Sequence, residues 1–228
     1  MAGNYKLTYN VDMVFCIDCT MSMEYILNVV KTNALNFYED VTKKMEEKHK
    51  HISQLRVRVV AFRDYLADGK DAMLVTDFFR LPEQAEDFER CVRSLQADGG
   101  GDDPEDGLEA LAYAIKSKWD TEGMKKRQVI VVWTDDATHP LGFGRASEYY
   151  PNGMAADLNE LTAWWGSAQQ KGFIDNNAKR LLLFAPDVPD WNVISRNWEN
   201  VLHFPSTAGE GLSEYEYEQI IDTISNTI

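Results

Sequence analysis

The chain has 228 residues, 44% of them hydrophobic, so it can bury one substantial core, and we expect a single domain over residues 1–228 with its core from about residue 10. Its formal net charge of −14 argues against nucleic acid and anionic membrane surfaces as partners, because phosphate binding requires clustered lysine and arginine. No apolar run has the length of a membrane span or of a signal-peptide core, and the three cysteines lack zinc-finger spacing, so we expect a reduced, cytoplasmic protein.

The first recognisable element is the apolar run over residues 13–17, which is short, rich in Val, Ile and Phe, and bounded by polar residues, as is typical of a buried strand. Apolar residues at three- and four-residue steps then predict a helix over residues 24–48. The turn between them carries Asp18, Thr20 and Ser22. It therefore places three oxygen donors at the carboxyl edge of a sheet, where open α/β sheets keep their ligands.

These three side chains suit a hard cation. Mg²⁺ takes oxygen ligands at about 2.1 Å in near-octahedral geometry, and one carboxylate and two short hydroxyls can converge on it with little side-chain entropy to lose. The alternative is that Thr20 or Ser22 caps the helix, since Ser, Thr and Asp are the preferred N-cap residues. The turn by itself favours neither interpretation, and the metal site needs further carboxylates.

The second strand is predicted over residues 55–62, where arginine and valine alternate, and it ends at Arg63–Asp64–Tyr65. A turn over 67–70 leads to a short strand over 72–79, close enough in sequence to form an antiparallel edge. A helix over 82–96 follows, with proline in its first turn and its apolar residues on one face.

A glycine-rich segment, GGGDDPE over residues 99–105, comes next. Its glycines allow close approach or positive φ, while Pro104 and the acids after it suit the first turn of a helix that we expect to reach about Trp119. One interpretation of Asp102 and Asp103 is an N-cap and a solvated acid. The other is that the flexible backbone brings Asp102 to the same edge as Asp18.

The strongest buried-strand pattern is QVIVVW over residues 128–133, which ends in Thr134, Asp135 and Asp136. A central parallel strand that ends in acids again places carboxylates at the carboxyl edge. The pattern also resembles a Walker B segment, but no phosphate-cradling G-x-x-x-x-G-K-[ST] loop accompanies it, and the glycines of the chain precede acids that repel phosphate.

A long polar and aromatic loop over residues 137–153 leaves the same edge, and loops of this length are often functional. We expect His139 to be a solvent-exposed loop residue rather than a metal ligand, and His139, Phe143, Tyr149 and Tyr150 are candidates to line a partner surface. The remaining elements are a helix over 155–170, strands over 180–185 and 201–204, and a closing helix over 212–227, with Trp191 and Trp198 as packing residues between them. The order of elements predicts an α/β fold, a Rossmann-like three-layer sandwich whose mostly parallel central sheet has one antiparallel edge strand and helices on both faces.

Four segments, IDCTMSM, AFRDY, GGGDDPE and WTDDATH, together resemble the von Willebrand factor type A domain. They are similar to the subgroup with D-x-T-G-S-M, F/Y-R-D, G-G-G-D-x-P-E and T-D-x-x-x-H signatures, and the resemblance extends from about Asn10 to the C-terminus. Proteins of that family hold Mg²⁺ or Mn²⁺ in a metal-ion-dependent adhesion site, and an acidic group of a bound partner commonly completes the metal shell. By motif position, the resemblance implies a site made of Asp18, Thr20, Ser22, Asp102 and Asp135, in which Ca²⁺ is a further candidate ion.

Two residues depart from that pattern. Met21 stands where the subgroup has glycine, so the turn is less free to adopt positive φ and a bulky apolar side chain lies beside the site. Asp102 replaces the threonine of the integrin-like pattern. If Asp102 binds the ion directly, three carboxylates leave a net charge of −1 and weaken the attraction of an acidic partner, whereas binding through water preserves that attraction.

The leading hypothesis is a non-enzymatic module that binds another protein through this metal. The resemblance to small bacterial members of the family makes a kinase and a phosphatase of one signalling set plausible partners. One alternative is a metal-dependent phosphoester hydrolase, with His139 as acid or base and Arg63 or Arg145 holding the phosphoryl group, although the D-x-D of phosphohydrolases is missing. The other is a vestigial site that binds partners without metal, for which Met21 is the main argument.

Overall fold

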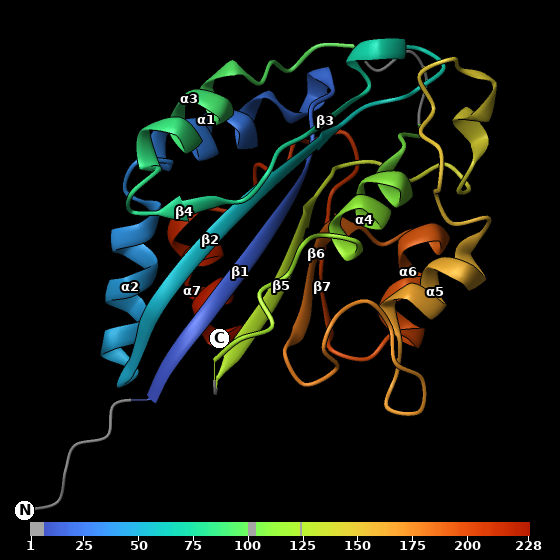
Figure 1. The fold of residues 1–228 in the computed structure, drawn as a ribbon. Coiled ribbons are helices and arrows are strands. Elements are labelled where there is room, and N and C mark those ends of the chain that lie inside the picture. The colour runs from blue at the N-terminus through green and yellow to red at the C-terminus, as the bar shows by residue number, and fades with distance from the viewer. Residues whose placement is uncertain (1–6, 100–103, 124) are drawn as a thin grey trace, which may run out of the picture.

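The computed structural model describes residues 7–99, 104–123 and 125–228. In this part of the chain one seven-stranded sheet has the order β3-β2-β1-β5-β6-β7, and β4 pairs with β2 (Figure 1). Strands β2, β1, β5, β6 and β7 are parallel, whereas β3 and β4 run antiparallel to β2. The strands are β1 (Leu7–Asp18), β2 (Lys50–Phe62), β3 (Met73–Val75), β4 (Phe79–Leu81), β5 (Lys126–Trp133), β6 (Lys179–Pro186) and β7 (Val201–Ser206).

Helices cover both faces of this sheet, which is the predicted three-layer architecture (Figure 1). One face carries α1 (Glu24–Asn33), α2 (Phe37–Glu47), α3 (Ala85–Ser94) and α7 (Tyr217–Thr227). The other carries α4 (Gly107–Ile115), α5 (Leu158–Trp165) and α6 (Pro189–Asn197).

Alternation along β1 divides the apolar side chains between two cores. Met13, Phe15 and Ile17 pack under α1, α3 and α7, while Val14 and Cys16 pack under α4 and α5. Because successive side chains of a strand point to opposite faces, a strand covered on both sides needs a continuous apolar run. This is why the centre of β1 and all of VIVVW in β5 are apolar and buried.

The predicted helix over residues 24–48 is two helices, α1 and α2. The chain leaves the helical path at Asn33, whose side-chain amide donates to the Val29 carbonyl at 2.8 Å, and α2 begins after Asn36. Asparagine competes for backbone hydrogen bonds in this way and favours helix ends. The apolar pattern continues across the break because Phe37, Val41 and Met45 of α2 remain buried.

Two further predictions are corrected by the structure. The strand expected over 72–79 is split into β3 and β4, because Thr76 between them turns its hydroxyl to the edge of β2 and accepts from the Val59 amide at 3.0 Å. Helix α6 was not predicted, although Pro189 at its first turn is a typical helix start. Trp191 lies on α6 and is buried, as expected of a packing residue.

The helices expected over 82–96, 104–119, 155–170 and 212–227 are present as the shorter α3, α4, α5 and α7. The loop over 137–153 is present and contains a 3₁₀ turn, Phe143–Ala146. In the described part of the chain, the helices are all too short or too polar to cross a membrane.

Candidate functional site

The candidate site lies where strands β1 and β5 end side by side. Ile17 of β1 is in register with Trp133 of β5, so Asp18 and the Thr134–Asp135 pair leave the sheet at the same carboxyl edge. Both aspartates are fully buried, whereas Ser22 is exposed at the surface. The edge therefore joins a buried pair of carboxylates to a hydroxyl that a partner can reach.

Hydrogen bonds connect four of the five predicted site residues. The Oδ1 atom of Asp18 accepts from the Thr20 amide at 2.9 Å and from the Thr20 hydroxyl at 2.6 Å. The Ser22 hydroxyl donates to Oδ1 of Asp135 at 2.9 Å and lies 3.5 Å from the Thr20 hydroxyl. The structure thus brings Asp18, Thr20, Ser22 and Asp135 together, while Asp102 lies outside the described residues.

This donor set fits a small divalent cation. Neighbouring ligands of an octahedral Mg²⁺ at about 2.1 Å lie roughly 3.0 Å apart. The oxygen–oxygen distances from Asp18 to Thr20, from Thr20 to Ser22 and from Ser22 to Asp135 are 2.6, 3.5 and 2.9 Å. All four donors are hard oxygens, which suit Mg²⁺ and Mn²⁺.

The electrostatics of Asp18 also suit a bound cation. Burial raises the pKa of Asp18 to about 6, and the charge of Asp135 adds to the rise, although hydrogen bonds from Thr20 and Thr134 oppose it. A buried carboxylate that also meets the charge of a second buried carboxylate is costly to ionise, and burial of a charge is tolerated when it is paired or binds a metal. A cation held between Asp18 and Asp135 would remove this cost.

Two residues that sequence reasoning missed complete the hydrogen bonding of the carboxylates. The Thr134 hydroxyl donates to Oδ2 of Asp18, and the Gly211 amide donates to Oδ2 of Asp135, both at 2.7 Å. Gly211 has φ +61°, and a Cβ atom there would lie 2.2 Å from the Ser22 carbonyl oxygen. Glycine is therefore required for the segment before α7 to approach the turn after β1.

His139 does not have the predicted exposure. The residue is only 4% exposed, its Nε2 atom lies 2.9 Å from Oδ2 of Asp64, and Phe143 stacks on its ring with ring centroids 3.9 Å apart. Asp64 is itself buried and accepts from the amides of Leu66 and Ala67. The prediction of a solvent-exposed histidine is wrong, because the acid of the AFRDY segment provides it with a buried partner.

Acids at the start of α4 hold two segments in place: Glu109 holds the long loop, and Asp106 holds the turn after β2. Oε1 of Glu109 accepts from the Gly142 amide at 2.7 Å and from the Tyr150 hydroxyl at 2.8 Å, and Asp106 accepts from the Tyr65 amide at 2.7 Å. Burial and the charge of Glu109 raise the pKa of Asp106 to about 7. Tyr150 therefore faces inward, leaving Phe143, at 46% exposure, and Tyr149, at 49%, as the exposed aromatic residues of the loop.

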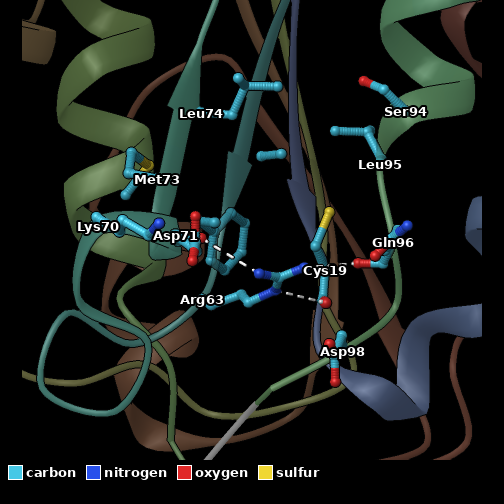
Figure 2. Close-up of a pocket in the computed structure, with 12 residues that line it drawn as sticks. Cys19, Arg63, Lys70, Asp71, Met73, Leu74, Ser94, Leu95, Gln96 and Asp98 are labelled. Atoms are coloured by element: carbon cyan, nitrogen blue, oxygen red, sulfur yellow. Dashed lines mark hydrogen bonds between the residues drawn. The ribbon is translucent and has the colours of Figure 1, made fainter.

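A pocket of about 430 Å³ opens beside the turn after β1, and Arg63 crosses it (Figure 2). The Arg63 guanidinium donates to the carbonyls of Cys19, Asp71 and Gln96 at 3.0, 3.3 and 2.8 Å. Arg145 likewise donates to the carbonyl of Ala156 at 2.9 Å. Both arginines that we considered as phosphoryl ligands thus hold main-chain carbonyls.

Comparison with known proteins supplies independent information about the family. The family model of the von Willebrand factor A domain matches residues 12–138. Alpha-protein kinase vwkA of Dictyostelium discoideum is 23% identical over 233 residues, which cover 94% of this chain and 33% of that protein.

Solved structures with a similar fold include the pilus adhesin SpaC of Lactobacillus rhamnosus GG. Its open conformation has a TM-score of 0.52 and 14% identity, and a second crystal structure has a TM-score of 0.50 and 12% identity. Each match covers 95% of this chain and 30% of the adhesin. The chain therefore spans about a third of the length of these relatives, and the likeness to the adhesin concerns the fold.

Proposed function

Because the chain belongs to the von Willebrand factor A domain family, whose model covers more than half of it, we propose that it is a non-enzymatic protein-binding module that holds a divalent cation at the carboxyl edge of its sheet. The observation that carries this proposal is the Ser22–Asp135 hydrogen bond, because it links the turn after β1 to the end of β5 and completes a set of four oxygen donors. Asp18, Thr20, Ser22 and Asp135 would hold Mg²⁺ or Mn²⁺, together with Asp102 as the motif implies.

The bound cation would supply a Lewis-acidic position to which an acidic side chain of the partner binds. Asp18 and Asp135 neutralise the ion from the buried side, and Thr20 and Ser22 contribute neutral donors. Ser22 is exposed, so a ligand from outside can approach on that side. If Asp102 also binds the ion directly, three carboxylates leave a net charge of −1 and weaken the attraction of an acidic partner. Binding of Asp102 through water preserves that attraction.

Exposed apolar side chains in the two segments that leave this edge of the sheet support a protein rather than a small molecule as the partner. Met21 is 68% exposed in the turn that carries the hydroxyls, and Phe143 and Tyr149 project from the long loop. Apolar and aromatic side chains with a polar surround are typical of protein interfaces. We infer that these residues form the rim of the interface around the cation.

The partner that we propose belongs to a phosphorylation signalling set with a kinase and a phosphatase. Its support is the matched relative, which is named an alpha-protein kinase and of which this chain corresponds to about a third.

Among the described residues, the side chains on which the two alternatives depend do not have the roles that those alternatives require. A hydrolase needs a free acid or base and a phosphoryl ligand, but His139 is buried against Asp64, and Arg63 and Arg145 are occupied by carbonyls. The argument for a vestigial site was Met21. This residue lies in the 3₁₀ turn Met21–Met23 with negative φ, so glycine is not required there, and its side chain points into solvent.

Thermal melting with and without Mg²⁺ or Mn²⁺ tests the proposal. The cation should raise the melting temperature of the wild type, and Asp18→Ala and Asp135→Ala should abolish that rise while leaving the far-UV spectrum unchanged. Asp190→Ala, which removes an exposed carboxylate on α6, is the matched control and should keep the rise. Equal stabilisation of the wild type and of all three variants would reject these ligands.

A further inference from the structure

A basic pocket lies at the opposite end of the sheet from the candidate metal site. Its volume is about 340 Å³, and it lies where β2, β5, β6 and β7 begin and α7 ends (Figure 1). Lys50, Arg127 and Arg180 line it, together with the amide side chains of Asn200 and Asn226. Three cations in one pocket are unexpected in a chain whose net charge is −14.

These cations have no acidic partner among the described residues. None of the ion pairs there involves Lys50, Arg127 or Arg180, and the acids of the region pair elsewhere, Asp175 with Lys126 and Asp222 with Lys44. Of the residues outside the described part, 1–6 and 124 include no acid in the sequence, whereas 100–103, in the segment before α4, contain Asp102 and Asp103. No carboxylate side chain of the described residues therefore compensates these cations, and the main-chain carboxylate of Ile228, which also lines the pocket, offsets one of the three charges.

Each cation also keeps a hydrogen-bond donor available. Arg127 donates through Nε to the Thr227 carbonyl at 3.2 Å and through Nη1 to the Lys126 carbonyl at 2.9 Å. Arg180 donates through Nη1 to the Lys179 carbonyl at 2.6 Å. Within the described residues, Nη2 of both arginines and Nζ of Lys50 make no hydrogen bond, although Lys50 and Arg127 both lie over the ring of Tyr9.

Pairing across strands explains why the two arginines share a face. Arg180 is in register with Val129, and Arg127 lies two residues before Val129 on the same side of β5. Burial and the charge of Arg127 lower the pKa of Arg180, and the same two causes lower that of Lys50. The fold thus holds like charges together at a cost that an anion would relieve.

We propose that this pocket binds a phosphate group. A phosphate carries about −1.5 to −2 charges, which matches the two positive charges that remain, whereas a further carboxylate offsets one of them. Arginine presents a planar fork that matches phosphate oxygens, and lysine adds a point charge.

Calorimetric titration of inorganic phosphate into the full chain at constant ionic strength tests this assignment. The buffer contains a chelator, because phosphate also binds divalent cations and a metal at the other edge would confuse the result. The wild type should bind phosphate saturably and acetate at least tenfold more weakly. Absence of saturable phosphate binding would overturn the assignment, whatever the outcome of the metal experiments.

Variants locate the binding. Arg180→Gln and Arg127→Gln should each weaken phosphate binding at least tenfold, whereas Arg90→Gln, which removes an exposed arginine of α3, should not change it. Arg180→Gln is the decisive variant if Arg127→Gln is poorly folded, since Arg180 contacts only main-chain carbonyls close to it in sequence. Equal affinities of Arg180→Gln and Arg90→Gln would contradict the assignment.

A second titration identifies the source of the phosphate group. Tighter binding of O-phosphoserine than of inorganic phosphate assigns the pocket to a phosphorylated protein side chain, and the reverse order assigns it to free phosphate. Either order supports the proposal when Arg180→Gln abolishes the preference. If Arg180→Gln keeps the same preference between O-phosphoserine and inorganic phosphate, the phosphate group binds elsewhere and the proposal is wrong.

Discussion

The Ser22 hydroxyl donates to Oδ1 of Asp135 at 2.9 Å, although 113 residues separate the two in sequence. This contact joins the turn after the first strand to the end of the central strand β5. The Gly211 amide, from the segment before the last helix, binds the other oxygen of Asp135. Three distant parts of the chain therefore meet at one carboxylate, and the consequences of changing each can be measured.

Replacing Gly211 by alanine should disrupt this meeting point. The new Cβ would lie 2.2 Å from the Ser22 carbonyl at a positive φ, so we expect a loss of about 2 kcal/mol or more in the free energy of unfolding and a smaller melting shift with Mn²⁺. Gly209→Ala is the control, because φ there is +73° but a Cβ meets no atom within 4 Å. Denaturant unfolding of both variants checks the difference, and equal losses would argue against a close approach at Gly211.

Met21→Gly should leave the metal site intact. Met21 is exposed and has negative φ, so the substitution removes no buried contact and costs at most about 1 kcal/mol through backbone entropy. Melting with and without Mn²⁺ should show the same rise for variant and wild type, while affinity for the partner falls because an apolar contact is lost. A clearly larger Mn²⁺ rise in the variant would mean that methionine does impair the site.

Glu109→Ala should release the long loop from α4. Two hydrogen bonds to one carboxylate oxygen are lost, and bonds to charged groups contribute about 1.5 to 3 kcal/mol each, so we expect the free energy of unfolding to fall by about 3 kcal/mol or more. Glu109→Gln keeps an acceptor oxygen and should lose less. Amide exchange at Gly142 reports the change locally, and protection of Gly142 that is unaltered in Glu109→Ala would contradict the anchoring role.

Asp106→Asn should change how stability depends on pH. The pKa of this carboxyl rises from 3.8 to about 7 in the folded protein, so the folded chain binds its proton more tightly, and stability is lost as pH rises through this window. The asparagine variant lacks this loss. Its free energy of unfolding should therefore rise relative to that of the wild type by about 2 kcal/mol as pH increases from 5 to 7. Denaturant unfolding across this range measures the gain, and parallel profiles would show that Asp106 does not carry it.

Sequence patterns predicted the sheet well because its central strands are buried on both faces and must be apolar throughout. The runs within β1 and β5 show this directly. The break between α1 and α2 was missed because the buried positions keep their helical spacing across Asn33–Asn36. Helix α6 was missed because only two of its residues, Trp191 and Ile194, are buried, so its sequence shows little apolar periodicity.

For the site, the sequence predicted the residues of local turns but not the contacts between segments that are distant in the chain. Asp18, Thr20 and Ser22 lie in one turn, and the acid at the end of a parallel strand must reach the same edge, so their meeting followed from topology. The contact of Gly211 depends on how the segment before α7 folds back, which no spacing in the sequence indicates. The burial of His139 depends in the same way on Asp64, 75 residues away.

A crystal soaked in Mn²⁺ and measured at the manganese absorption edge tests the central claim most directly. The account predicts one anomalous difference peak at the carboxyl edge of the sheet, beside the Thr20 and Ser22 hydroxyls and between the carboxylates of Asp18 and Asp135. Asp18 and Asp135 pointing to different places, with no peak between them, would contradict it.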